Sequence, residues 1–162
     1  MFFGYNGINR KAIYAVLIIL AVIQVASMSS EAWLYILLTL PAVIIAVTFH
    51  EYAHALAADK LGDTTPRNQG RLNLNPMSHI DPVGFMLLMF AGFGWGKPVQ
   101  INPRNFNRDV RMDKGEAIVS FAGPLMNFVL AIVSCFAYTS IYMFAGISFT
   151  TSFAGSIILY LL

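Results

Sequence analysis

Long apolar runs constrain this chain more than any other feature of its sequence. Hydrophobic residues make up 57% of its 162 residues and charged residues only 11%, whereas an ordinary water-soluble domain carries about 25% charge. A surface in contact with water needs charge, so a chain this poor in charge either hides its surface or faces lipid. The sequence therefore predicts an all-α membrane protein, folded as a polytopic helical bundle.

Five apolar runs predict about four to five membrane segments, at residues 12–27, 33–58, 83–95, 117–144 and 147–162. A helix needs about 20 apolar residues to cross a bilayer. The third run is shorter and contains several glycines, so we expect it to be re-entrant or packed inside the bundle; a crossing remains open. The last run stops at Leu162 with no cap or flanking charge. We therefore expect a single membrane-embedded domain over residues 1–162 that is incomplete at its C-terminus.

The polar segments between these runs carry the charge. Residues 71–75 alternate polar and apolar side chains, which predicts a short strand and a small β-hairpin-like insertion after the second run. If the third run does not cross, all Lys and Arg residues fall on one side of the membrane. This bias predicts a multi-pass protein of the cell membrane whose basic side is cytoplasmic. The basic residues are Arg10, Lys11, Lys60, Arg67, Arg71, Lys97, Arg104, Arg108, Arg111 and Lys114.

The second run ends in the segment His50-Glu51-Tyr52-Ala53-His54. Residues i and i+4 share one face of a helix, so His50 and His54 could bind one Zn²⁺ ion from the same side. Glu51 would act as the catalytic base by taking a proton from a water molecule that the zinc acidifies. Since His54 lies ~9 Å of helix before Lys60, the site is expected within the membrane, near its cytoplasmic side.

A catalytic zinc site has three protein ligands and one open position. Within this chain, His79 and Asp81 are the candidates for the third ligand. The alternative interpretation is that both belong to a structured turn at the start of the third run.

Several stretches together resemble the site-2 protease family of intramembrane zinc metalloproteases, in its compact form without accessory domains. They are residues 49–55 (FHEYAHA), 70–76 (GRLNLNP), 79–84 (HIDPVG), 93–99 (FGWGKPV), 102–106 (NPRNF) and 122–127 (AGPLMN). Residues 1–48 match the family only in hydropathy. The resemblance implies that His50 and His54 are zinc ligands and that Glu51 is the base. It also places Asn127 near the active site, although an amide there could equally tie two helices together.

The chain departs from this family in one respect. The family's third zinc ligand is an aspartate in a Leu-Asp-Gly motif on a later membrane helix, and these 162 residues contain no such motif. The resemblance therefore implies a third ligand beyond Leu162, and the role is not transferred to Asp81.

The function that these features favour is zinc-dependent endopeptidase activity on transmembrane or juxtamembrane protein segments. Its partners would be the lipid bilayer and a membrane protein substrate, which the edge of the predicted strand could hold in an unwound form. A non-catalytic pseudoprotease that binds transmembrane helices is the alternative, but it has no need of Glu51. A metal transporter is disfavoured because residues 117–144 lack ionisable His, Asp, Glu, Lys and Arg. The sequence does not indicate nucleic-acid binding, and it gives no information on the oligomeric state.

Overall fold

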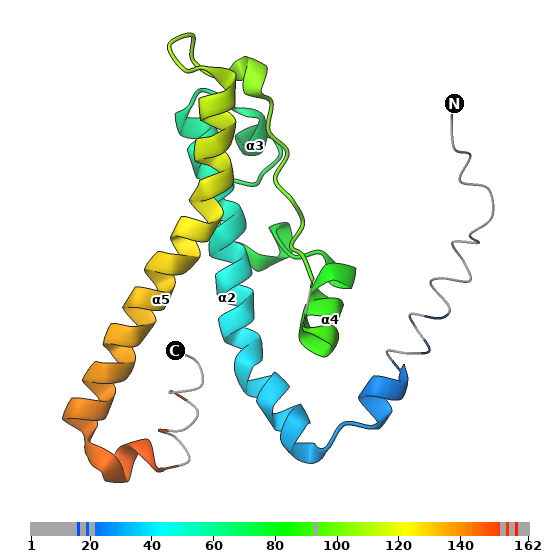
Figure 1. The fold of residues 1–162 in the computed structure, drawn as a ribbon, viewed down its shortest axis with the longest axis vertical. Helices are drawn as coiled ribbons and strands as arrows, with labels where there is room; N and C mark the ends of the chain where they lie inside the picture. The colour runs from blue at the N-terminus through cyan, green and yellow to red at the C-terminus, as the bar shows by residue number, and fades with distance from the viewer. Residues whose placement is uncertain are drawn as a thin grey trace. The chain divides into compact units, whose positions relative to one another are not determined.

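The computed structural model describes residues 22–92 and 94–152, together with the isolated residues 16, 19, 155 and 158. Within these residues the fold is entirely helical and contains no strand (Figure 1). The chain divides into two compact units, Met1–Tyr35 and Ile36–Leu162. Its elements are α2 (Ser30–Lys60), α3 (Thr65–Asn68), the 3-10 helix η1 (Pro76–Ser78), α4 (Pro82–Ala91), the 3-10 helix η2 (Pro103–Asn105) and α5 (Met112–Thr150).

Helices α2 and α5 are each long and apolar enough to cross a membrane. Their most apolar windows have mean hydropathies of 2.2 and 2.0, and only 6% and 11% of the residues in those windows are buried. An interior helix of a water-soluble protein would be mostly buried, so these two present their apolar side chains outward. They correspond to the second and fourth predicted segments, whereas the runs at 12–27 and 147–162 lie largely outside the described residues.

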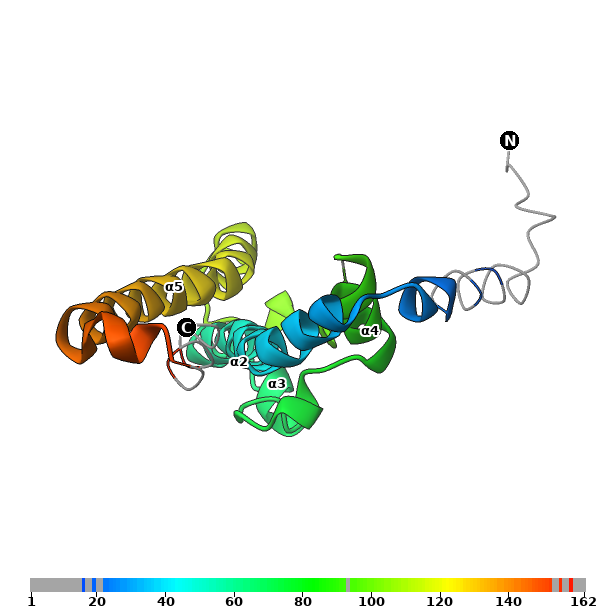
Figure 2. The ribbon, with the colours of Figure 1, turned by 90° about the horizontal axis from the view of Figure 1, so that it is seen from below.

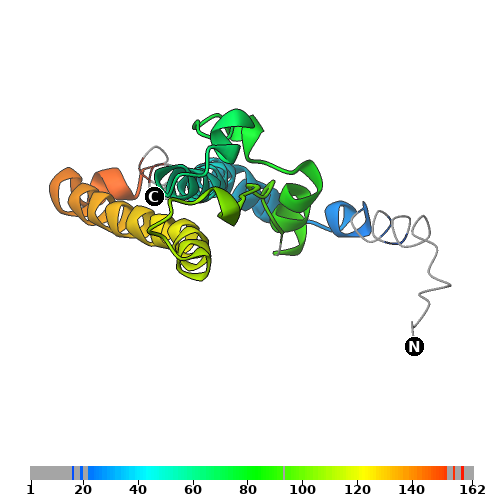
Figure 3. The ribbon, with the colours of Figure 1, turned by 90° about the horizontal axis from the view of Figure 1, so that it is seen from above.

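Within the larger unit, α2 lies between α5 on one side and α4 on the other, as the views from two further directions agree (Figures 2 and 3). A small apolar core closes the end of α2 near Lys60. Its buried members are Ala58, Phe106 and Val119, with Ala57, Leu61, Ile101 and Val110 packed against them. This core joins the last turns of α2 to the first turns of α5, so the two helices are packed together at that end.

The segment that contains α4 is an excursion: the chain leaves at His79 and returns beside it at Lys97. Asp81 caps its N-terminus, accepting a hydrogen bond of 2.8 Å from the Gly84 N–H, and Gly92 ends it in the left-handed conformation at φ 74°. Its 10 residues give ~15 Å of helix, half the thickness of a hydrocarbon core. Where the chain returns, the Lys97 N–H donates to the His79 carbonyl at 2.7 Å. The two ends of this segment are therefore joined by a backbone hydrogen bond.

The strand predicted at residues 71–75 is wrong, because asparagine side chains occupy the backbone groups that a ladder would need. Asn73 Oδ1 accepts from the Asn75 N–H at 2.7 Å, and Asn75 Oδ1 accepts from the Met77 N–H at 3.1 Å. The His79 Nε2–H donates to the Asn73 carbonyl at 2.7 Å. The segment is therefore a folded loop, and the expected β-hairpin-like insertion does not form.

Asp63 fixes the loop that leads into α5. Its fully buried carboxylate accepts hydrogen bonds from the Thr65 N–H and hydroxyl at 3.0 and 2.5 Å, from the Asn102 N–H at 2.6 Å and from Asn105 Nδ2 at 3.0 Å. Burial alone would raise the pKa of Asp63, but these hydrogen bonds outweigh it and lower the pKa. The ionised carboxylate thus ties the end of α2 to the segment around η2.

Candidate metal centre

His50 and His54 lie one turn apart on α2, and their rings meet edge to face with centroids 4.7 Å apart. Both Nε2 atoms point to the same place on α5, which is Gly123. A Cβ added to Gly123 would lie 2.6 Å from His50 Nε2 and would overlap His54 Nε2 even more closely. Only glycine leaves room for this approach, so the backbone of α5 passes directly beside two converging imidazole nitrogens.

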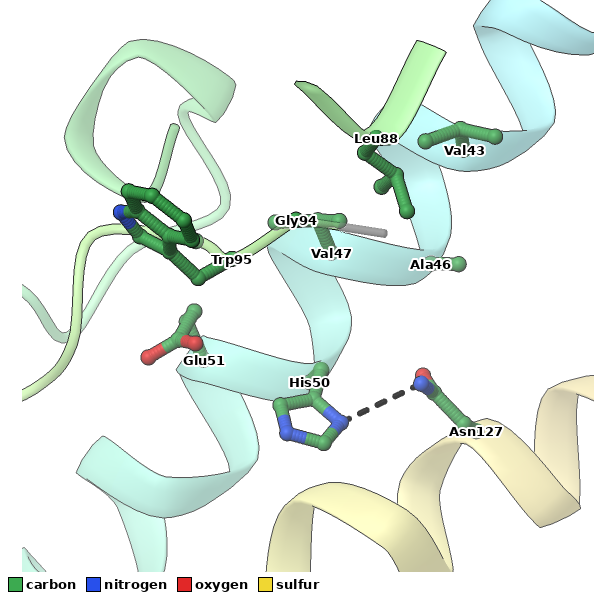
Figure 4. A pocket seen from close by; sticks show the side chains of 10 residues that line it. Val43, Ala46, Val47, His50, Glu51, Leu88, Gly94, Trp95 and Asn127 are labelled. Atoms are coloured by element: carbon green, nitrogen blue, oxygen red, sulfur yellow. Dashed lines mark hydrogen bonds between the residues drawn. The ribbon is translucent and has the colours of Figure 1, made fainter. Parts of the chain in front are cut away.

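Each ring also has a partner at its other nitrogen. His54 Nδ1 lies 2.6 Å from the Val119 carbonyl oxygen. A carbonyl oxygen can only accept, so Nδ1 of His54 carries a proton, and in the neutral tautomer Nε2 keeps its lone pair. His50 Nδ1 lies 3.2 Å from Asn127 Nδ2 (Figure 4). Histidines that bind metals in proteins donate their second ring N–H to an acceptor, as His54 does here to the Val119 carbonyl.

This arrangement fits a zinc ion. Two imidazoles from adjacent turns present Nε2 toward one point, which is the donor set and spacing of a zinc helix. Within the ranges that the structure describes, no third His, Cys, Asp or Glu joins them to complete a cluster. The described part of the chain therefore contributes two imidazole donors, with Glu51 as their neighbour.

His79 and Asp81 do not belong to this site. His79 is fully buried in the loop before α4, where its Nε2–H is engaged with Asn73, and Asp81 is engaged as the cap of α4. Burial lowers the pKa of His79 and the nearby Arg71 guanidinium lowers it further, whereas the hydrogen bond to Asn73 raises it. Both residues serve the turn into α4, as the alternative interpretation of the sequence had it.

Glu51 lies on the wall of a cavity of about 500 Å³ between α2, α4 and α5 (Figure 4). Glu51 is only 9% exposed. The backbone at Gly96 passes over it, since a Cβ added to Gly96 would lie 3.0 Å from Glu51 Oε1. The other residues that line the cavity are mostly apolar: Val43, Ala46, Val47, His50, Leu88, Gly94, Trp95, Gly96 and Asn127. A carboxylate and an imidazole therefore face a space that suits an apolar chain segment.

Arg71 holds the segment that covers Glu51. Its side chain is 8% exposed, and its guanidinium donates to the carbonyl of Ser78 and, at 3.4 Å, to the carbonyl of Lys97. These two carbonyls stand before and after α4, so one cation clamps both ends of the excursion. Sequence reasoning used Arg71 only as a loop charge, because nothing in its sequence neighbourhood shows that its partners are backbone carbonyls.

Comparison with known proteins finds no matching family model and no matching solved structure. It does find relatives among proteins that are named as zinc metalloproteases. "Putative zinc metalloprotease YwhC" of Bacillus subtilis is 45% identical over 102 residues, which are 63% of this chain and 44% of that protein. "Putative zinc metalloprotease Rip2" of Mycolicibacterium smegmatis is 31% identical over 96 residues, which are 56% of this chain and 35% of that protein.

The chain thus spans less than half the length of the curated relatives that it matches. The sequence segments resemble a family of zinc metalloproteases, and the names of both relatives confirm this resemblance.

Proposed function

We propose that this chain is part of a zinc-dependent endopeptidase that cleaves transmembrane or juxtamembrane segments of membrane proteins. The observation that carries the proposal is the convergence of His50 Nε2 and His54 Nε2 on Gly123, with Glu51 on the wall of the adjoining cavity. The names of the two relatives support zinc as the metal and peptide hydrolysis as the reaction.

His50 and His54 would hold the metal. Zinc, when bound, supplies Lewis-acid chemistry, since it polarises a carbonyl and acidifies water. Glu51 stands next to His50 in sequence and faces the cavity, so its carboxylate takes the proton of the attacking water and passes it to the leaving amine. The apolar lining of the cavity keeps the scissile peptide and the carboxylate away from bulk water, where their interaction would be weaker.

The place of the site on α2 supports a substrate within or beside the membrane. His50 and His54 lie within a helix that is long and apolar enough to span, and ionisable groups in such a helix usually serve function. A helical substrate hides its carbonyls in hydrogen bonds, so it must unwind locally before Glu51 can act on it. The basic loops before and after α4 support a multi-pass protein whose site opens near the cytoplasmic side.

A non-catalytic protein that binds transmembrane helices is the second candidate. It would use the apolar faces of α2 and α5 and the cavity between the helices. It gives no role to a mostly buried carboxylate beside two converging imidazoles, and burial of such a group is unfavourable. The position of Glu51 therefore favours the enzyme.

The test is a comparison of wild type with Glu51→Gln. The full-length protein is expressed in membranes with a panel of single-pass candidate substrates, and cleavage and zinc content are measured together. We expect cleavage by the wild type that a zinc chelator blocks, a loss of about 10²- to 10⁴-fold in Glu51→Gln, and unchanged zinc content in the variant. Equal cleavage by both proteins would exclude the catalytic role of Glu51. Substrate binding by both without any cleavage would favour the non-catalytic candidate.

A further inference from the structure

Asn127 lies on α5, and only one end of its side-chain amide has a hydrogen-bond partner. Its Nδ2 lies 3.2 Å from His50 Nδ1, whereas its Oδ1 is buried and has no hydrogen-bond partner. Within the described residues, only one other buried side-chain atom, His79 Nδ1, shares this condition. A buried polar atom without a partner is unfavourable, so the unpaired oxygen beside the His50 ring needs a physical explanation.

The state of the His50 ring supplies one. With Nδ2 facing it, His50 Nδ1 must accept, so the proton of a neutral ring sits on Nε2. An imidazole that gives its Nε2 lone pair to a metal carries its proton on Nδ1 instead. Two donors, Nδ1–H and Nδ2–H, would then face each other. A half-turn of the Asn127 amide removes this conflict, because it brings Oδ1 to the position where an acceptor is needed.

We propose that Asn127 is a positioning residue of the metal centre, whose Oδ1 accepts the Nδ1–H of His50 when the metal is bound. The proposal rests on the metal site of the proposed function and names a residue that orients one of its ligands. Asn127 Oδ1 would then act on His50 as the Val119 carbonyl acts on His54, where it accepts a hydrogen bond from Nδ1. Each ring is held by one oxygen of α5, and both Nε2 atoms remain free for the ion.

The half-turn changes little else in the structure. One end of the amide lacks a partner in either orientation, so the number of unpaired buried atoms at Asn127 stays the same. Occupation of Nε2 would select the orientation with Oδ1 on His50, because only that orientation gives the His50 Nδ1–H an acceptor. Loss of such a partner typically lowers metal affinity by about 10- to 100-fold.

The competing role for Asn127 is a tie between α2 and α5 in which Nδ2 is the necessary donor. Two variants separate these roles, because Asn127→Asp keeps the acceptor and removes the donor, whereas Asn127→Leu removes both at similar volume. Ser134→Ala, two turns further along the same side of α5, is the matched control for loss of a polar group.

The measurement is zinc affinity of the purified full-length protein in detergent, by competition with a fluorescent chelator. Thermal unfolding of the metal-free proteins is followed in parallel to check that each variant folds. We expect wild-type affinity or better in Asn127→Asp, a 10- to 100-fold loss in Asn127→Leu and no change in Ser134→Ala. In addition, ¹⁵N spectra of the zinc-loaded wild type should show His50 protonated at Nδ1.

Asn127→Asp that loses zinc as severely as Asn127→Leu would overturn the proposal, as would Asn127→Leu with wild-type affinity. Neither result depends on proteolysis. A wild type that binds zinc as expected but cleaves no substrate would sink the proposed function and leave the assignment of Asn127 standing.

Discussion

Gly123 of α5 touches the imidazole of His54 across the helix interface, with no side chain between them. The contact explains how a backbone carbonyl one turn earlier, that of Val119, reaches the other nitrogen of the same ring at 2.6 Å. The site therefore depends on how closely two helices approach as much as on the identity of its histidines.

Gly123→Ala should remove the metal site while the helices persist. The added methyl occupies the place where the two Nε2 atoms converge, so we expect zinc affinity to fall at least about tenfold, the loss typical of a disturbed ligand shell. Gly115→Ala is the control for packing: its Cβ would lie 2.5 Å from the Phe106 ring in the first turn of α5, so it strains the core between α2 and α5 without entering the space beside the two Nε2 atoms. Zinc titration of both variants tests this prediction. Wild-type zinc affinity in Gly123→Ala would contradict the convergence of the two Nε2 atoms on Gly123.

Gly96→Ala should affect catalysis and spare the metal. Its Cβ would meet Glu51 Oε1 at 3.0 Å, and the His79 carbonyl and Val47 at 3.1 Å each, so either the covering segment or the carboxylate must shift. Misplacement of a base by a fraction of an ångström to 1 Å lowers turnover by roughly ten- to a hundredfold. We expect that loss in kcat with unchanged zinc content, measured on one preparation. A variant that lost zinc in parallel with activity would refute this separation.

Ala46→Phe should narrow the cavity beside Glu51. The larger ring would fill part of the roughly 500 Å³ that the apolar lining encloses, and we expect cleavage of substrates with bulky apolar residues near the scissile bond to fall most. Ile45→Phe is the control, because Ile45 is 49% exposed and does not line the cavity. Cleavage of a peptide series graded by side-chain size tests this; identical size profiles in both variants would argue against the cavity as a binding site.

The loop before α4 should lose stability in mild acid. Burial and the Arg71 cation lower the pKa of folded His79 below its ordinary value of 6.5, so the unfolded chain binds a proton more readily than the folded one. Stability is therefore full above about pH 6.5 and declines as the pH falls toward the folded pKa. We expect the unfolding midpoint to fall between pH 7 and 5 and His79→Gln, which keeps a donor to Asn73, to flatten this dependence. An unaltered slope in that variant would assign the effect elsewhere.

Hydropathy and helical spacing were sufficient to find α2, α5 and the pairing of the His50 and His54 rings on one face of α2, because these features are local in sequence. The strand at residues 71–75 was predicted from alternation alone. That alternation is real, but the polar members are asparagines, and Asn73 and Asn75 bind neighbouring backbone groups in preference to a second strand.

The contacts that hold the two rings could not be predicted in this way. His54 and Val119 are 65 residues apart, and His50 and Asn127 are 77 apart. The Val119 partner is a main-chain oxygen that every residue possesses, so its side chain carries no signal. Gly123 belongs to a stretch that the family resemblance had marked, yet its use as the point of closest approach depends on the path of α5.

The clamp formed by Arg71 has a consequence for the segment that covers Glu51. Because one guanidinium bridges the carbonyls of Ser78 and Lys97, the two flanks of α4 are held together by a single side chain. A displacement of either flank would therefore be passed on to the backbone at Gly96, which lies against Glu51.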